Sequence, residues 1–134
     1  RGAELHGFLS YLVKTALNKK VYKVFGFKGK QVRDNLHSSD LVNAFWEFYK
    51  KPKIGKVYNI GGSRKSNCSI LEAVYLIEDF AKIKVNLKLI NKARVGDHIW
   101  WITNNSKFKK DYPNWKQNYD IKKIIKELIK NNDG

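Results

Sequence analysis

Apolar side chains recur at intervals of three and four along two segments in the first half of the chain, which is the spacing of one face of an α-helix. The first segment covers residues 5–17. The second covers residues 40–49, and either Ser38 or Ser39 can serve as its N-cap. The pattern predicts two helices that each bury one face.

Three further helices are expected in the second half. Ser69 and Glu72 have the spacing of a capping box, which predicts that a helix begins there and continues to residue 82. Ser106 can cap a short helix that ends at Asp111. Residues 121–129 combine a helical apolar face with a lysine-rich outer face.

Four short segments have the alternation or the apolar character of β-strands. They are residues 21–25, 32–36, 56–60 and 85–89, of which 56–60 is expected to be a buried strand. Residues 26–29 form a predicted turn, Gly61-Gly62 a close backbone turn, and the following residues a loop as far as Cys68. The mixture predicts an α/β or α+β domain in which helices cover a small mixed sheet.

The length of 134 residues fits one domain that is large enough to bury a core of its own. The chain starts with Arg1 and contains no methionine, so we expect it to be a piece of a longer protein. A single cysteine, the absence of a signal-like start and the absence of a run of about eighteen apolar residues favour a cytoplasmic location without a membrane span.

The net charge of +15 raises the possibility of a nucleic-acid-binding module. The lysines are scattered without any block of five like charges, however, which is typical of a lysine-rich composition and argues against nucleic acid as a partner. Only four of the 27 basic residues are arginines. Because the planar guanidinium grips a phosphate in two places, these rare arginines are candidates for a specific role.

Two short motifs carry the candidate chemistry. Arg33 lies in a predicted strand between Gln31 and Asp34, where it can either face a ligand or form an ordinary surface ion pair with Asp34. Arg94 and Asp97 flank a glycine turn, so that one can hold phosphate while the other accepts hydrogen bonds from ribose hydroxyls. The two motifs together predict a diphosphate grip.

Aromatic residues near these motifs have two interpretations. Tyr22 and Phe25 can stack on a nucleobase, although at least one of them is expected in the strand core. Residues 98–102 include Trp100 and Trp101 and are assigned to core or interface. The spacing of the three histidines and of Cys68 predicts no metal site, and Gly61-Gly62 lacks the third glycine of a dinucleotide-binding turn.

Taken together, the motifs resemble the C-terminal half of extended short-chain dehydrogenases/reductases, specifically the NAD-dependent nucleotide-sugar epimerases and dehydratases, and among them the CDP-paratose 2-epimerase group. The segments that carry the resemblance are residues 4–9 (Glu-Leu-His-Gly-Phe-Leu), 29–38 (Gly-Lys-Gln-Val-Arg-Asp-Asn-Leu-His-Ser), 57–62 (Val-Tyr-Asn-Ile-Gly-Gly) and 94–97 (Arg-Val-Gly-Asp).

The resemblance implies that residues 1–134 are the nucleotide-sugar substrate-binding domain of such an enzyme. In that family an N-terminal Rossmann domain holds NAD and the catalytic Tyr-x-x-x-Lys pair, so this chain would contain no cofactor site and no catalytic residue, and would not turn over alone. The substrate, a CDP- or UDP-linked sugar, would contact residues that match the family's binding positions. These are Arg33 and Arg94 for the diphosphate, Asp97 for the ribose, and Gln31, Tyr22, Phe25, Leu5 and His6 around the nucleotide.

The same resemblance implies that the chain closes against the missing Rossmann domain. The helix at residues 5–17 and the region of Trp100 are the expected contact surfaces, and the bare apolar area is expected to favour a homo-oligomer. Two other classes remain open at this point, a basic nucleic-acid-binding module and a module that only mediates assembly.

Overall fold

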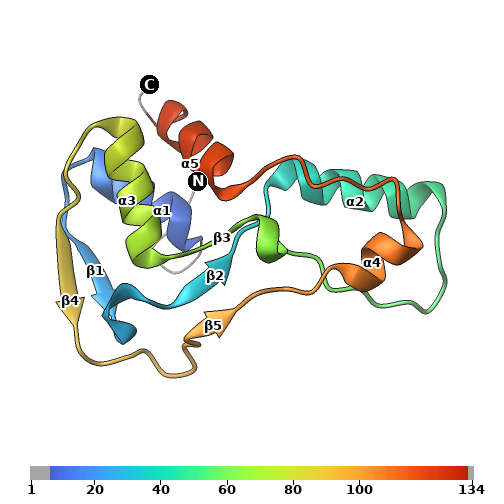
Figure 1. The fold of residues 1–134 in the computed structure, drawn as a ribbon, viewed down its shortest axis with the longest axis horizontal. Helices are drawn as coiled ribbons and strands as arrows, with labels where there is room; N and C mark the ends of the chain where they lie inside the picture. The colour runs from blue at the N-terminus through green and yellow to red at the C-terminus, as the bar shows by residue number, and fades with distance from the viewer. Residues whose placement is uncertain (1–6, 133–134) are drawn as a thin grey trace.

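The computed structural model describes residues 7–132, which form helices and short strands in alternation (Figure 1). The helices are α1 (Phe8–Leu17), α2 (Ser38–Lys50), α3 (Ile70–Ala81), α4 (Ser106–Asp111) and α5 (Ile121–Lys130). The strands are β1 (Tyr22–Phe25), β2 (Val32–Asp34), β3 (Asn67–Ser69), β4 (Leu87–Ile90) and β5 (Trp100–Trp101). Two short 3-10 turns, η1 (Phe27–Gly29) and η2 (Ser63–Lys65), complete the order of elements.

The strands form two small sheets. β1 pairs with β4 in parallel, while β2 lies between β3, which is antiparallel to it, and β5, which is parallel to it. The predicted mixed α/β class is confirmed, with the strands divided between two sheets. Both sheets combine segments that are far apart in the sequence, and this pairing brings the two candidate motifs together.

The main core lies where α1, α3 and α5 pack against one another and α1 meets β1. Leu12, Ile77 and Ile125 are completely buried there, and Val24 of β1 is 1% exposed. Burying each such side chain contributes about 1.5–3 kcal/mol relative to leaving it in water. This core is the rigid support on which β1 and β2 present their side chains.

A smaller lobe consists of α2, residues 51–62 and α4, and lies at the opposite end of the molecule from α1, α3 and α5 in Figure 1. Ala44, Phe108, Tyr112 and Trp115 form its buried core. The Phe108 and Trp115 rings meet edge to face at 5.3 Å between centroids, which is a favourable aromatic geometry.

The helix starts were partly predictable. The capping box of α3 is confirmed: Glu72 N–H donates to Ser69 Oγ over 3.1 Å, and Ser69 N–H donates to Glu72 Oε2 over 2.7 Å. The predicted serine cap of α2 is wrong, because His37 is the N-cap and its Nδ1 accepts from Ser39 N–H over 3.2 Å. An imidazole nitrogen therefore caps α2 in place of the predicted serine hydroxyl.

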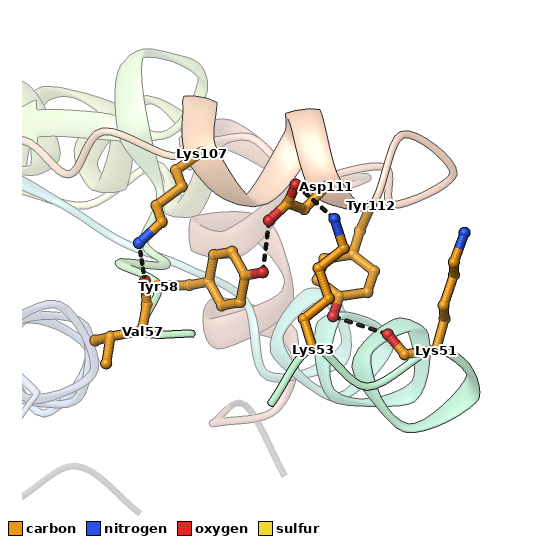
Figure 2. Close-up of polar contacts among 7 residues, drawn as sticks. All are labelled: Lys51, Lys53, Val57, Tyr58, Lys107, Asp111 and Tyr112. Atoms are coloured by element: carbon orange, nitrogen blue, oxygen red, sulfur yellow. Dashed lines mark hydrogen bonds and ion pairs between the residues drawn. The ribbon is translucent and has the colours of Figure 1, made fainter. Parts of the chain in front are cut away.

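The strand predicted at residues 56–60 is wrong. The segment belongs to no sheet among the described residues, and Val57 is 77% exposed. Contacts to α4 hold it instead: Lys107 Nζ donates to the Val57 carbonyl over 2.7 Å, and Tyr58 Oη donates to Asp111 Oδ2 over 2.6 Å (Figure 2). Lys53 Nζ completes the cluster by pairing with Asp111 Oδ1 over 2.7 Å. Residues 56–60 have no neighbouring strand among the described residues.

Other strand boundaries also shift. β4 begins two residues later than predicted, and β2 ends at Asp34. β3 and β5 were missed, because β3 was assigned to a loop and β5 to an aromatic core or interface segment. Trp100 and Trp101 form β5 beside β2 with side chains that are 64% and 55% exposed.

The apolar face of α1 packs inward, and a contact of its outer face with another domain stays a prediction. Its apolar residues Leu9, Leu12 and Val13 are buried in the main core. Within the part of the chain that the structure describes, no helix has both the length and the apolar character needed to cross a membrane.

Candidate functional site

Two loops span the same gap between the two sheets. Residues 26–31 connect β1 to β2, and residues 91–99 connect β4 to β5. Since β4 pairs with β1 and β5 pairs with β2, both loops must run from the first sheet to the second side by side. Sheet pairing therefore explains why motifs about sixty residues apart in the sequence meet in space.

The two loops pack tightly against each other at Gly26. A Cβ added to this glycine would lie 2.6 Å from the Cβ of Ala93, and its φ of +64° is one that other residues adopt at a cost. In the second loop, Asp97 N–H donates to the Arg94 carbonyl over 3.2 Å and Gly96 has a φ of +77°. This turn presents the side chains of Arg94 and Asp97 to residues of β1 and β2.

Arg33 projects from β2 into the space between the loops. Its Nη1 donates to the Val32 carbonyl over 2.8 Å, and its Nη2 forms an ion pair with Asp97 Oδ1. The two side chains are 23% and 25% exposed. The sequence left open a surface ion pair between Arg33 and Asp34. Arg33 pairs instead with Asp97 of the 91–99 loop.

Asp34 has a different role that sequence reasoning missed. Its Oδ2 accepts from the backbone N–H of Ser63 over 2.8 Å and from that of Thr103 over 3.0 Å. A carboxylate that binds two backbone donors fixes the chain around it. Asp34 thus anchors the residues after β5 and the start of η2 to the end of β2. Its distant partners left no local sequence signal.

Phe25 and Tyr22 lie at the same site. The guanidinium carbon of Arg94 is 4.4 Å from the centre of the Phe25 ring, a cation–π geometry that orients Arg94 over the pocket. Tyr22 is 8% exposed and packs in the main core, where its ring centroid lies 5.7 Å from that of Tyr11. At least one of the two aromatics is thus a strand-core residue, as expected.

Gln31 is buried beside them. It is 4% exposed, and its Nε2 donates to the Phe25 carbonyl over 3.2 Å. Its Oε1 is buried and has no hydrogen-bond partner among the described residues. An orphaned acceptor at this position is unusual in a folded interior.

These residues line one pocket with a volume of about 360 Å³. Six predicted site residues lie in its wall, whereas Leu5 and His6 fall outside the described residues, so the structure does not place them. The wall carries the cations Arg33, Arg94 and Lys23 and the carboxylates Asp34 and Asp97. The predicted residues in the wall are Tyr22, Phe25, Gln31, Arg33, Arg94 and Asp97.

The described residues do not fit a dinucleotide phosphate at Gly61-Gly62. A Cβ added to Gly62 would lie 2.3 Å from the carbonyl oxygens of Asn35 and Ser66, so the chain's own backbone fills the space. This close approach matches the expected tight backbone turn. Residues 7–132 also contain no group of three His, Cys, Asp or Glu side chains arranged to hold a metal ion.

Comparison with known proteins shows which proteins the chain is similar to. Residues 1–61 match the model of the NAD dependent epimerase/dehydratase family. The chain is 30% identical over 133 residues to the dTDP-glucose 4,6-dehydratase of Haemophilus influenzae, a match that covers 95% of the chain and 36% of that protein. It is 37% identical over 73 residues to the CDP-paratose 2-epimerase of Salmonella typhi, covering 53% of the chain and 21% of that protein.

The solved structures agree at the level of the fold. MoeE5 in complex with UDP-glucose and NAD superposes with a TM-score of 0.81 at 22% identity, covering 92% of this chain and 40% of that one. The chain is therefore a relative of the NAD-dependent nucleotide-sugar epimerases and dehydratases, as its motifs predicted. It spans well under half the length of the relatives that it matches.

Proposed function

We propose that residues 1–134 bind the diphosphate of a nucleotide sugar, as the C-terminal substrate-binding part of an NAD-dependent epimerase or dehydratase. The observation that carries the proposal is the shared pocket: Arg33 of β2 and Arg94 of the 91–99 loop line the same cavity, beside Asp97. A volume of about 360 Å³ lies within the range of ordinary small-molecule sites.

Each pocket residue has a distinct part in the proposed binding. Arg33 and Arg94 hold the two phosphates through charge-assisted hydrogen bonds, which are stronger than neutral ones. Asp97 accepts hydrogen bonds from the ribose hydroxyls. Gln31, with its orphaned Oε1, and Phe25 are the pocket residues that we assign to the base. A CDP-linked sugar fits the resemblance to the CDP-paratose 2-epimerase, and a UDP-linked sugar is the alternative substrate.

The redox chemistry belongs to the rest of the proposed enzyme. NAD supplies the hydride transfer when it is bound there, while the residues of this chain position the substrate. Positioning a bound sugar relative to a cofactor can lower a barrier by several kcal/mol. The isolated chain is therefore expected to bind without turnover.

The proposed partner is the Rossmann domain of such an enzyme, and the small lobe offers a surface for it. Four apolar residues at helical spacing on α2 are 56–74% exposed. We call these residues the α2 stripe, and they are Val42, Phe45, Trp46 and Tyr49. Large bare patches of this kind rarely stay uncovered in soluble monomers.

A calorimetric titration tests the binding proposal. CDP, UDP and a single-stranded oligonucleotide are titrated into the wild-type chain, Arg33→Ala and Arg64→Ala. Arg64 is the control because it is an exposed arginine that does not line the pocket. Losing hydrogen bonds to a charged group costs about 1.5–3 kcal/mol, so Arg33→Ala should weaken nucleotide binding by about ten- to a hundredfold while Arg64→Ala has little effect.

The oligonucleotide arm separates the rival class. A basic nucleic-acid-binding module would bind the oligonucleotide with an affinity that falls steeply with salt and does not depend on Arg33, because scattered lysines would carry it. Equal affinity of the wild-type chain and Arg33→Ala for CDP would refute the diphosphate grip. Failure to bind any of the three ligands would favour a module that serves only in assembly.

A further inference from the structure

We infer that Asp97 makes the pocket selective for nucleoside diphosphates over bare inorganic phosphates. The Asp97 carboxylate is paired with Arg33, and it releases Arg33 to a phosphate when ribose hydroxyls are present to bind the carboxylate instead. The inference rests on the proposed function of the pocket and adds a specificity-determining residue to it. It starts from the ion pair between Asp97 Oδ1 and Arg33 Nη2.

Both terminal nitrogens of Arg33 already have a hydrogen-bond partner in the structure. Its Nη1 is bound to the Val32 carbonyl and its Nη2 to Asp97. An anion that approaches Arg33 must therefore displace the Asp97 carboxylate or lie beside it. An anion that lies beside the Asp97 carboxylate is repelled strongly by it, because the pocket is partly desolvated.

Asp97 is the pocket carboxylate that is able to exchange partners. The other one, Asp34, is tied to the backbone N–H groups of Ser63 and Thr103. The only side-chain partner that the structure gives Asp97, among the described residues, is Arg33. The turn that carries Asp97 also has room, because a Cβ added to Gly96 would meet nothing within 4 Å.

A nucleoside diphosphate can replace the hydrogen bonds of both Arg33 and Asp97, whereas inorganic pyrophosphate can replace only those of Arg33. A nucleoside diphosphate gives Arg33 its phosphate and gives Asp97 the two hydroxyls of the ribose, so both charged groups regain hydrogen bonds. Inorganic pyrophosphate gives Arg33 the same charge but leaves Asp97 without a donor. An unpaired, partly buried carboxylate is costly, so the pocket rejects the bare anion.

Three ligands test this on the 134-residue chain by calorimetry: CDP, 2′,3′-dideoxy-CDP and inorganic pyrophosphate. The wild-type chain should bind CDP about tenfold or more tightly than dideoxy-CDP, although the two carry the same charge. In Asp97→Asn the affinity for pyrophosphate should rise, and the preference for CDP over pyrophosphate should fall by about tenfold or more. Asp79→Asn is the matched control, because it removes the same charge from an exposed site on α3 and should leave the preference unchanged.

The ratio of affinities is the decisive readout. If Asp97 only repelled anions, Asp97→Asn would raise the affinities for CDP and for pyrophosphate by the same factor. That result would overturn the inference while leaving the diphosphate grip intact. Equal binding of CDP and dideoxy-CDP by the wild-type chain would overturn it as well, without any variant. If the wild-type chain bound none of the three ligands, both the inference and the proposed function would fail.

Discussion

The guanidinium carbon of Arg94 lies 4.4 Å from the centre of the Phe25 ring, so a residue of the 91–99 loop is oriented by the last residue of β1. This contact exists because β4 pairs with β1, with Ile90 opposite Phe25. An exposed, flexible arginine would lose side-chain entropy on binding a ligand, and the ring reduces that loss by holding the guanidinium over the pocket beforehand.

Replacing the ring should therefore weaken nucleotide binding. An exposed cation–π contact is worth about 0.5–1 kcal/mol, so Phe25→Leu should lower the affinity for CDP by about two- to fivefold. Phe27→Leu is the control, because Phe27 lies in η1 and lines a different cavity. Equal effects of the two substitutions in the calorimeter would show that the Phe25 ring does not position Arg94.

Asp40 should be the most sensitive polar residue of the small lobe. It is completely buried, and its two carboxylate oxygens accept from the N–H groups of Asn118 over 2.9 Å and Tyr119 over 3.0 Å. Asparagine has only one acceptor oxygen and would point an NH₂ group at the second donor. Asp40→Asn should therefore lower the free energy of unfolding by about 1–3 kcal/mol in urea titrations.

Asp120→Asn provides the control for this prediction. Asp120 caps α5 by accepting from Lys123 N–H over 2.8 Å, and asparagine caps a helix about as well as aspartate. Its substitution should change stability little. A small effect of Asp40→Asn as well would mean that the link between α2 and the segment before α5 contributes little to the fold.

The stability of the small lobe should depend on pH through Asp111. Hydrogen bonds from Lys53 and Tyr58 hold the pKa of the Asp111 carboxyl below its usual value, as Figure 2 shows for the contacts. Burial and the bond to Asp111 raise the pKa of Tyr58, so its hydroxyl stays protonated and donates at neutral pH. A depressed carboxyl pKa stabilises the folded state above the unfolded value of about 3.9, and this contribution is lost as the pH falls through the folded value.

Urea titrations at neutral pH and in strong acid test this sign. Asp111→Asn should be less stable than the wild-type chain at pH 7, and the difference should shrink as the solution becomes acidic. The pKa of Glu78 is also lowered, chiefly by a backbone hydrogen bond from Val85, but that group is present in both proteins and cancels in the difference. A difference that did not vary with pH would show that Asp111 acts only through packing.

The sequence predicted those parts of the fold whose signal is local. The capping box of α3 and the apolar faces of α1, α3 and α5 depend on residues within one or two turns of each other, and all are found in the structure. β3 and β5 escaped prediction because they are two or three residues long and exist only through pairing with β2. Residues 56–60 show the reverse case, since they have a strand-like composition but pair with no strand among the described residues.

The candidate site shows the same division. Arg33, Arg94 and Asp97 could be selected from the rarity of arginine and from a glycine turn, and the structure places all three in one pocket. That Arg33 pairs with Asp97 rather than Asp34 could not be predicted, because it depends on β5 lying beside β2. The anchoring bonds of Asp34 to Ser63 and Thr103 depend on the same long-range pairing.

The α2 stripe should drive self-association of the 134-residue chain, with a second copy covering the surface that we assign to a Rossmann domain. Trp46 and Tyr49 stack at 5.4 Å between centroids and are 56% and 74% exposed. The net charge of +15 on each copy opposes contact, so association should increase when salt screens that charge. Sedimentation should show more dimer at high than at low ionic strength, the opposite of the salt dependence of nucleic-acid binding.

A substitution on the stripe separates this effect from general stickiness. Trp46→Ser should weaken the dimer about thirtyfold or more, since a large aromatic that serves as an interface hot spot contributes about 2 kcal/mol or more. Tyr75→Ser is the control, because Tyr75 is 77% exposed on α3, away from α2. A chain that stays monomeric at high concentration and high salt would contradict the assignment of the stripe as an interface. Equal weakening by both substitutions would mean that exposed aromatics associate without regard to their position.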